Sequence, residues 1–212
     1  MIVGFIVLVL MLEFIIRKFS LPRIAVSPGK VHQVFLNFRG DQLRHNYVSH
    51  LGHALQRNGI KFFIDEDEQK GEDLDNLFVR IEESRIALAI FSTRYSESKW
   101  CMKELVKMKK LVDLKELRVI PIFYKVEAED VRRPKGDSEF GKNFWKLVQD
   151  DSSGDDLKNW KEALECISQK AGFVVDGKSS ESDSIEKIVK ALQSILGMKT
   201  IKEKGWELQL RI

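Results

Sequence analysis

The chain has 212 residues, of which 43% are hydrophobic and 32% are charged, and its formal net charge is only +3. This length fits one domain with appended segments, and the near balance of charges argues against a nucleic-acid-binding protein, which usually carries a concentrated basic surface. With only two cysteines, Cys101 and Cys166, the sequence excludes a disulfide framework and predicts free thiols inside helices.

The first 21 residues differ in composition from the rest of the chain. The run MIVGFIVLVLMLEFII is apolar except for Glu13, and Arg17 and Lys18 follow it directly. A membrane-spanning helix needs about 20 apolar residues, so we expect residues 1–21 to be a hydrophobic anchor with the following domain in the cytosol. The alternatives are a cleaved signal peptide and a cytoplasmic protein. Residues 22–30 contain two prolines and one glycine, which is typical of a linker.

From residue 31 onward, short apolar runs alternate with amphipathic stretches. The runs predict strands at 33–38, 60–65, 85–92, 117–124 and 173–176. The amphipathic stretches predict helices at 44–59, 74–84, 98–112, 157–172 and 182–197. Asn58-Gly59 is expected to end the first of these helices, Ser98 to cap the third, and Ser182 or Ser184 to cap the last.

This alternation predicts an α/β fold with a five-stranded parallel sheet in the flavodoxin-like order 2-1-3-4-5, flanked by helices. The nearly continuous apolar run at 85–92 is typical of a central strand buried on both faces. Ligands of such sheets bind beyond the carboxyl ends of the strands, where the strand order reverses. Here that point lies between the first and third strands, beside the loops Arg39–Asp41 and 92–100.

Several functional classes do not fit these loops. A phospho-receiver domain needs an aspartate at the end of its third strand, but this strand ends in IFSTRY. Arg39-Gly40 is not followed by the further glycines of a phosphate-binding loop. The acidic run 65–68 follows the second strand instead, and it is more typical of a solvated surface than of a metal site.

One carboxylate in the predicted helix 98–112 stands out by its position. The apolar stripe of this helix comprises Cys101, Leu105, Met108 and Val112. At about 100° per residue, Glu104 lies roughly 60° to one side of Cys101, and Trp100 lies one turn earlier on the same flank. We therefore expect Glu104 at the margin of the core, as a partly desolvated carboxylate beside an indole. The alternative is a surface glutamate paired with Lys103 or Lys107.

The motifs VFLNFRG, IEESRIALAIFSTRYSESKWCMKEL and VIPIFYKVEAEDVR together resemble plant TIR (Toll/interleukin-1 receptor) domains. The resemblance covers residues 31–197 and leaves 198–212 as a C-terminal tail. It implies the flavodoxin-like TIR fold, and it implies an NAD+ nucleosidase that acts in plant innate immune signalling. In this family the glutamate of the W-C-x-x-E-L motif, Glu104 here, is catalytic. NAD+ is then the substrate, and no cofactor or metal ion is implied.

The resemblance also implies binding residues and partners. It assigns contacts with NAD+ to Phe38, Arg39, Gly40, Lys70 and Trp100. It assigns self-association, and association with other TIR-domain proteins, to the Ser49-His50 pair together with the helix 182–197. The alternative is a catalytically inactive adaptor that works through TIR–TIR association.

Two departures from the family pattern flank these positions. The family usually has Arg-Gly-Glu-Asp-Thr-Arg after the first strand, where this chain has Gln42 and Leu43 in place of the second acid and the threonine. The run DEDE at 65–68 also makes the loop after the second strand more acidic than usual.

Overall fold

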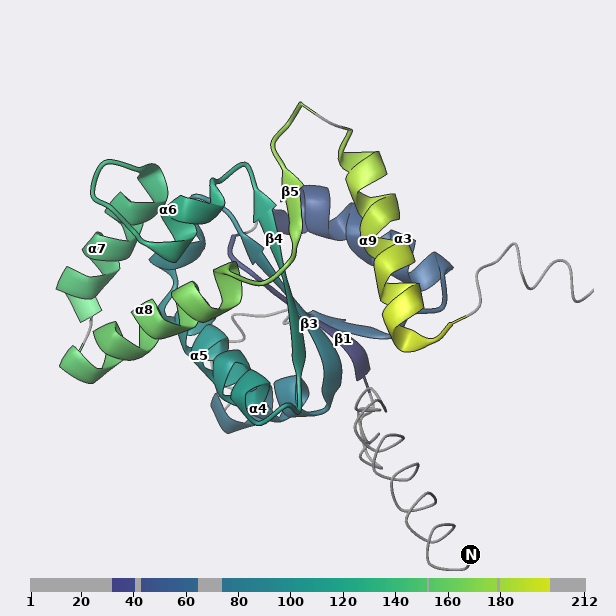
Figure 1. Cartoon of the computed structure of the whole chain (residues 1–212), viewed down its shortest axis with the longest axis horizontal. Coiled ribbons are helices and arrows are strands. Elements are labelled where there is room, and N and C mark those ends of the chain that lie inside the picture. Colours follow the sequence, from purple (N-terminus) through teal and green to yellow (C-terminus); the bar gives the residue numbers. More distant parts are fainter. Residues whose placement is uncertain (1–31, 41–42, 65–73, 152, 179, 199–212) are drawn as a thin grey trace, which may run out of the picture.

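The computed structural model of the chain describes residues 32–40, 43–64, 74–151, 153–178 and 180–198. At its centre lies a sheet of five parallel strands in the order β2-β1-β3-β4-β5 (Figure 1). The strands are β1 (His32–Phe38), β2 (Phe62–Ile64), β3 (Ser84–Phe91), β4 (Arg118–Tyr124) and β5 (Phe173–Val175). The predicted fold class and strand order are therefore confirmed.

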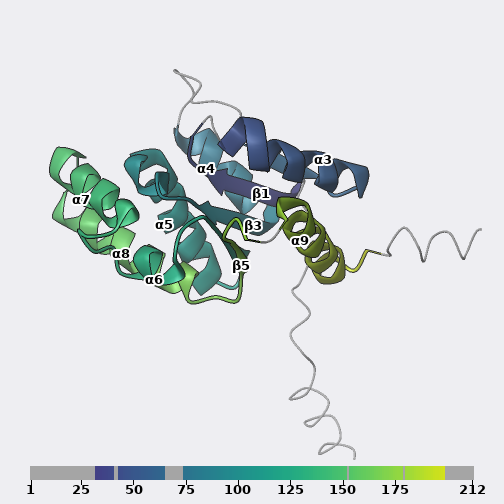
Figure 2. The same ribbon diagram turned by 90° about the horizontal axis from the view of Figure 1, so that it is seen from above.

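The sheet separates two layers of helices, which lie on its opposite sides in Figures 1 and 2. One layer consists of α3 (Ser49–Arg57) and α9 (Glu181–Leu196). The other consists of α4 (Leu74–Glu82), α5 (Lys99–Asp113), α6 (Ala128–Arg132), α7 (Glu139–Asp151) and α8 (Gly154–Ser168). Each layer packs its own apolar cluster against one face of the sheet.

Side chains along β1 alternate between these two layers, as in any strand. Val34 and Leu36 are buried in the cluster beneath α3 and α9. Phe35 is buried in the cluster beneath α4, α5 and α8. Asn37 shares the parity of Phe35, so it faces the α5 layer, whereas Phe38 faces the α3 layer.

Helix α5 follows from a good cap and a regular apolar stripe. Ser98 is the N-cap, and its Oγ accepts a hydrogen bond from the backbone nitrogen of Cys101 at 3.2 Å. Cys101, Leu105 and Met108 are buried against the sheet, as their spacing predicts. The predicted cap and the predicted helix are both confirmed, and the end of the helix is extended by one residue to Asp113.

The helix predicted at 44–59 is divided in two. A π-helical turn, η1 (Arg44–Val48), precedes α3. Asn58 is the C-cap of α3, and Gly59 follows it with a φ of +71°, so the predicted Asn-Gly end is confirmed. The π turn was not predicted, because the apolar spacing of its residues is the same as that of an α-helix within this short span.

In the later part of the chain, one expectation was wrong and two helices were missed. Helix α9 begins at Glu181 with Ser180 as its N-cap, so the capping role expected of Ser182 or Ser184 was wrong. The Ser184 side chain is instead buried, with its Oγ 3.4 Å from the hydroxyl of Tyr47. Helices α6 and α7 were not predicted.

Among the described residues, no helix has the length and apolar character needed to cross a membrane. The expected anchor at 1–21, the linker at 22–30 and residues 199–212 of the expected tail lie outside the residues that the structure describes. Cys101 is buried, Cys166 is half-buried, and neither of them forms a disulfide.

Candidate functional site

The candidate site lies at the carboxyl end of β1, beside the first turns of α5. Strands β1 and β3 pair in parallel from His32 and Ser84 to Phe38 and Ile90, so both strands end at the same edge of the sheet. The chain leaves β3 through a short 3-10 turn, η2 (Tyr95–Glu97), and enters α5 at Lys99. This path brings η2 and α5 to the end of β1, as the switch-point position predicts.

Glu104 is the central carboxylate of this region. Only 3% of the residue is exposed, so it lies deeper than the core margin that helical spacing predicts. Its Oε2 accepts a hydrogen bond of 2.6 Å from Nδ2 of Asn37 on β1. The surface ion pair considered as an alternative is not formed with Lys107, which pairs with Glu82 of α4 instead. A buried polar partner on the neighbouring strand explains why the carboxylate can lie inside the apolar stripe.

Two further groups lie in the surroundings of this carboxylate. The hydroxyl of Tyr95 donates to Oδ1 of Asn37 at 2.5 Å and also points to the carbonyl oxygen of Cys101 at 3.2 Å. The Cys101 thiol donates to the carbonyl oxygen of Phe38 at 3.3 Å. Burial raises the pKa of Tyr95 well above 10, with smaller contributions from Cys101 and Glu104, so the phenol is protonated and available as a donor at neutral pH.

The end of β1 and the loop after it carry three of the expected ligand-contacting residues, Phe38, Arg39 and Gly40. All three are half-buried. Gly40 has a φ of +99°, a conformation that favours glycine, and its carbonyl oxygen accepts from the backbone nitrogen of Arg44 at 3.2 Å. The guanidinium of Arg44 lies 5.2 Å from the centre of the Phe38 ring. The Arg44 side chain therefore lies over the Phe38 ring at the end of β1.

The structure also explains one departure from the family pattern. Leu43, which stands where the family usually has threonine, is 7% exposed and belongs to the apolar cluster beneath α3 and α9. A larger apolar side chain there adds to the core. Gln42, like Asp41, lies outside the described residues.

Trp100 and Lys70 complete the set of expected NAD-contacting residues. Trp100 is the second residue of α5 and is half-buried. Lys70 and the acidic run 65–68 lie outside the part of the chain that the structure describes. Within the described part, no group of three or more histidine, cysteine, aspartate or glutamate side chains could hold a metal ion.

Comparison with known proteins shows the family of the chain. A family model described as TIR domain matches residues 31–209. The chain belongs to the TIR domain family. The disease resistance protein RBA1 of Arabidopsis thaliana is 54% identical over 166 residues, which make up 78% of this chain and 45% of RBA1. The chain thus spans less than half of the length of this relative.

Two further relatives match this TIR domain over a larger share of their own length. A TIR domain-containing protein of Arabidopsis thaliana is 44% identical over 178 residues, covering 79% of this chain and 70% of the relative. The TIR domains of the activated Roq1 resistosome, which recognises the pathogen effector XopQ, align with a TM-score of 0.66 and 36% identity. That alignment covers 76% of this chain and 98% of the Roq1 chain.

The expected association residues of this TIR domain lie in the other helix layer. His50 is exposed and Ser49 is half-buried, both in the first turn of α3. Helix α9 lies alongside α3 in both ribbon views (Figures 1 and 2). Nε2 of Gln193 on α9 donates to Oδ1 of Asn58 at the end of α3, at 3.2 Å. The structure thus brings Ser49, His50 and α9 into one layer, and Glu104 lies in the other.

Asn37 and Tyr95 are the site residues that sequence reasoning missed. Asn37 is 1% exposed and Tyr95 is fully buried. A signal was present for Asn37, because it is a polar residue within the otherwise apolar run VFLNF. No local pattern marks Tyr95, which reaches Asn37 from 58 residues away in the chain.

Proposed function

We propose that this TIR domain is an NAD+ nucleosidase that acts in plant innate immune signalling. The enzyme would hydrolyse the bond between nicotinamide and ribose and release nicotinamide with ADP-ribose or a cyclised product. The observation that carries the proposal is the carboxylate of Glu104, buried at the carboxyl edge of the sheet and held by Asn37 at 2.6 Å. A buried carboxylate at a ligand-binding edge is costly to stability, which favours a functional reason for its presence.

The chemistry suits a single carboxylate. Nicotinamide leaves as a neutral molecule with the bonding electron pair, so its departure needs little acid assistance. Positive charge develops on the ribose as an oxocarbenium ion, as it does in glycoside hydrolysis. A fixed carboxylate facing this charge stabilises the transition state more than the ground state. Water then bonds to the anomeric carbon and loses its proton to solvent.

The loop after β1 would provide the binding half of the site. Arg39 would attract the pyrophosphate, and the half-buried Phe38 ring would line the nucleotide beside it. Gly40, in its left-handed conformation, lets the backbone approach the substrate closely because no side chain intervenes. Trp100, in the first turn of α5, would form a wall of the same pocket.

The test is the release of nicotinamide from NAD+ by the full chain, with the products identified by chromatography. Glu104→Ala and Glu104→Gln should each lose at least about 100-fold in turnover, because the transition-state charge loses its counter-charge. The matched control is Glu97→Gln, since Glu97 pairs with Arg94 at 2.9 Å on the surface of the adjacent turn. Equal turnover in wild type and Glu104→Ala would contradict the proposal.

The assay needs conditions in which the domain can assemble. The related Roq1 TIR domains were solved within an activated resistosome, so we expect turnover to rise with protein concentration. Because residues 1–21 are expected to be an anchor, the assay is run with and without lipid vesicles. An inactive adaptor would show no turnover in any of these conditions, yet its association with other TIR domains would weaken in His50→Ala, since His50 is exposed on α3.

A further inference from the structure

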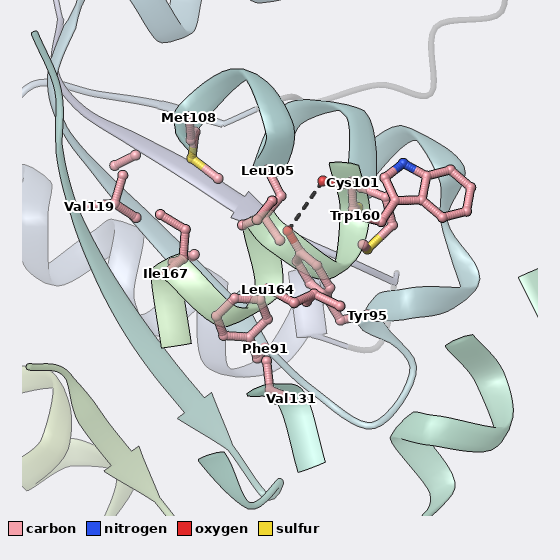
Figure 3. Close-up of a cluster of buried hydrophobic side chains, with 14 of the residues drawn as sticks. Phe91, Tyr95, Cys101, Leu105, Met108, Val119, Val131, Trp160, Leu164 and Ile167 are labelled. Atoms are coloured by element: carbon pink, nitrogen blue, oxygen red, sulfur yellow. Dashed lines mark hydrogen bonds between the residues drawn. The ribbon is translucent and has the colours of Figure 1, made fainter. Parts of the chain in front are cut away.

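Tyr95 lies in an apolar layer, with its polar end directed at the site. Its ring packs edge-on against Phe91, with ring centres 4.8 Å apart. Figure 3 shows the ring among Phe91, Leu164 and Val131, with a dashed line from its hydroxyl to the carbonyl oxygen of Cys101. The hydroxyl is therefore the one polar group that this side chain offers, and the surrounding packing fixes where it points.

Tyr95 and Glu104 together determine which way the Asn37 amide is oriented. Tyr95 carries a single hydroxyl proton. The hydroxyl oxygen lies 2.5 Å from Oδ1 of Asn37 and 3.2 Å from the carbonyl oxygen of Cys101. With the amide oxygen accepting this proton, Nδ2 is directed to Glu104. If the amide were reversed, its oxygen would lie 2.6 Å from a carboxylate oxygen, and two acceptors would repel each other.

We propose that Tyr95 and Asn37 are positioning residues that hold the Glu104 carboxylate in one orientation for its reaction. This inference rests on the proposed NAD+ nucleosidase function. Tyr95 fixes Asn37, and Asn37 fixes one carboxylate oxygen, so the carboxylate needs no rearrangement as charge develops on the ribose. Neither residue has to touch the substrate to have this effect.

Contacts from α7 support the turn that carries Tyr95. Oγ of Ser96 donates to the carbonyl oxygen of Phe140 at 3.0 Å. Nδ2 of Asn143 donates to the carbonyl oxygen of Thr93 at 2.9 Å. Ser96 is fully buried and adjacent to Tyr95, but its hydroxyl points to α7 and away from the carboxylate. Ser96→Ala is therefore a matched control for the loss of one buried hydrogen bond in the same turn.

The kinetic test compares Tyr95→Phe with Ser96→Ala in the full chain. Tyr95→Phe keeps the ring and removes only the hydroxyl, so kcat for nicotinamide release should fall about 10- to 100-fold, with KM changed by less than about twofold. Ser96→Ala should keep the wild-type kcat. In an Asn37→Leu background, Tyr95→Phe should cause no further loss of kcat, because the Asn37 amide through which Tyr95 acts on Glu104 is already absent. Additive losses would overturn the proposal.

A second measurement does not depend on turnover. In the wild-type chain, one side-chain amide proton of Asn37 should exchange slowly with solvent in NMR spectra, because it is bound to Glu104. Tyr95→Phe should abolish this protection and Ser96→Ala should preserve it. Persistent protection in Tyr95→Phe would refute the positioning role. Protection that depends on Tyr95, in a protein without any turnover, would support the positioning role and contradict the NAD+ function.

Discussion

Replacing Gly141 with alanine tests whether the backbone packing beside the site is as close as the structure indicates. Gly141 lies in the first turns of α7, where the preceding loop passes directly over it. A Cβ atom added there would lie 2.5 Å from the carbonyl carbon of Lys135 and 2.8 Å from its nitrogen, with the carbonyl oxygen closer still. The loop would have to move away, since real Cβ atoms essentially never approach within 3.0 Å of such atoms.

The expected cost follows from this displacement. Overpacking of a close-packed site costs about 1 to 3 kcal/mol. Hydrogen bonds also hold the loop to α7, among them those from Nε1 of Trp145 to the carbonyl oxygen of Pro134 at 3.0 Å and from the Gly141 nitrogen to Oγ of Ser138 at 3.1 Å. Loss of each of these two hydrogen bonds would cost about 1 kcal/mol. The higher helix propensity of alanine would offset up to about 1 kcal/mol of the total. We therefore expect Gly141→Ala to lower the free energy of unfolding by about 2 to 4 kcal/mol.

The assay is urea denaturation followed by tryptophan fluorescence, supported by calorimetry. For a chain of this size, the expected loss lowers Tm by about 4 to 16 °C. Gly154→Ala is the control, because Gly154 is the first residue of α8 and a Cβ there would meet nothing within 4 Å. That variant should keep its stability or gain up to about 1 kcal/mol. Equal stability of the two variants would refute the close approach at Gly141.

Two further predictions concern the loop after β1 and the layer of α3 and α9. Gly40→Ala should lower the free energy of unfolding by about 1 to 2 kcal/mol, because a φ of +99° strains any residue with a Cβ. The same variant should reduce nicotinamide release. Unchanged stability and unchanged release would contradict this prediction. Burial raises the pKa of Tyr47 from 10.0 to about 12, so its contribution to stability is complete below pH 10 and is lost as the pH rises to 12. Between pH 9 and pH 12, ionisation of Tyr47 should lower the unfolding free energy of the wild type by up to about 2.7 kcal/mol. Tyr47→Phe should lack this contribution, and an identical pH dependence in both proteins would refute the assignment.

Much of the fold was predictable because its signals are local. The run at 85–92 is apolar almost throughout, and the structure confirms a central strand at Ser84–Phe91. The parallel order followed from the alternation of strands and helices alone. The short edge strands β2 and β5 have three residues each, so their predicted boundaries extended too far.

Helix α7 shows a signal that was present but not used. Phe140, Phe144 and Leu147 recur at helical spacing and are all buried. Between the fourth strand and α8, the glycines and charges interrupt this pattern and favour a loop. The short α6, with five residues, has too few turns for periodicity to be measured. Its position depends on Val131, which is fully buried in the core.

The candidate site was only partly predictable, for a physical reason. Helical spacing placed Glu104 at the core margin, but its burial depends on Asn37, which lies 67 residues away in the chain. A hydrogen bond between distant segments is a property of the folded sheet, and no periodicity within one helix can reveal it. The expected cap at Ser184 failed similarly, because the Tyr47 hydroxyl lies beside the serine only after η1 and α9 have come together in the folded chain.

The alternation of β1 has a practical consequence for protein engineering. Neighbouring residues at its carboxyl end serve different layers: Asn37 belongs to the layer of Glu104, and Phe38 packs beneath α3 and α9. The sheet therefore separates the layer of Glu104 from the layer of α3 and α9. Exposed residues of α3 and α9 could therefore be exchanged for those of a relative to change partner choice, while the carboxylate and its supports on the opposite face keep their geometry.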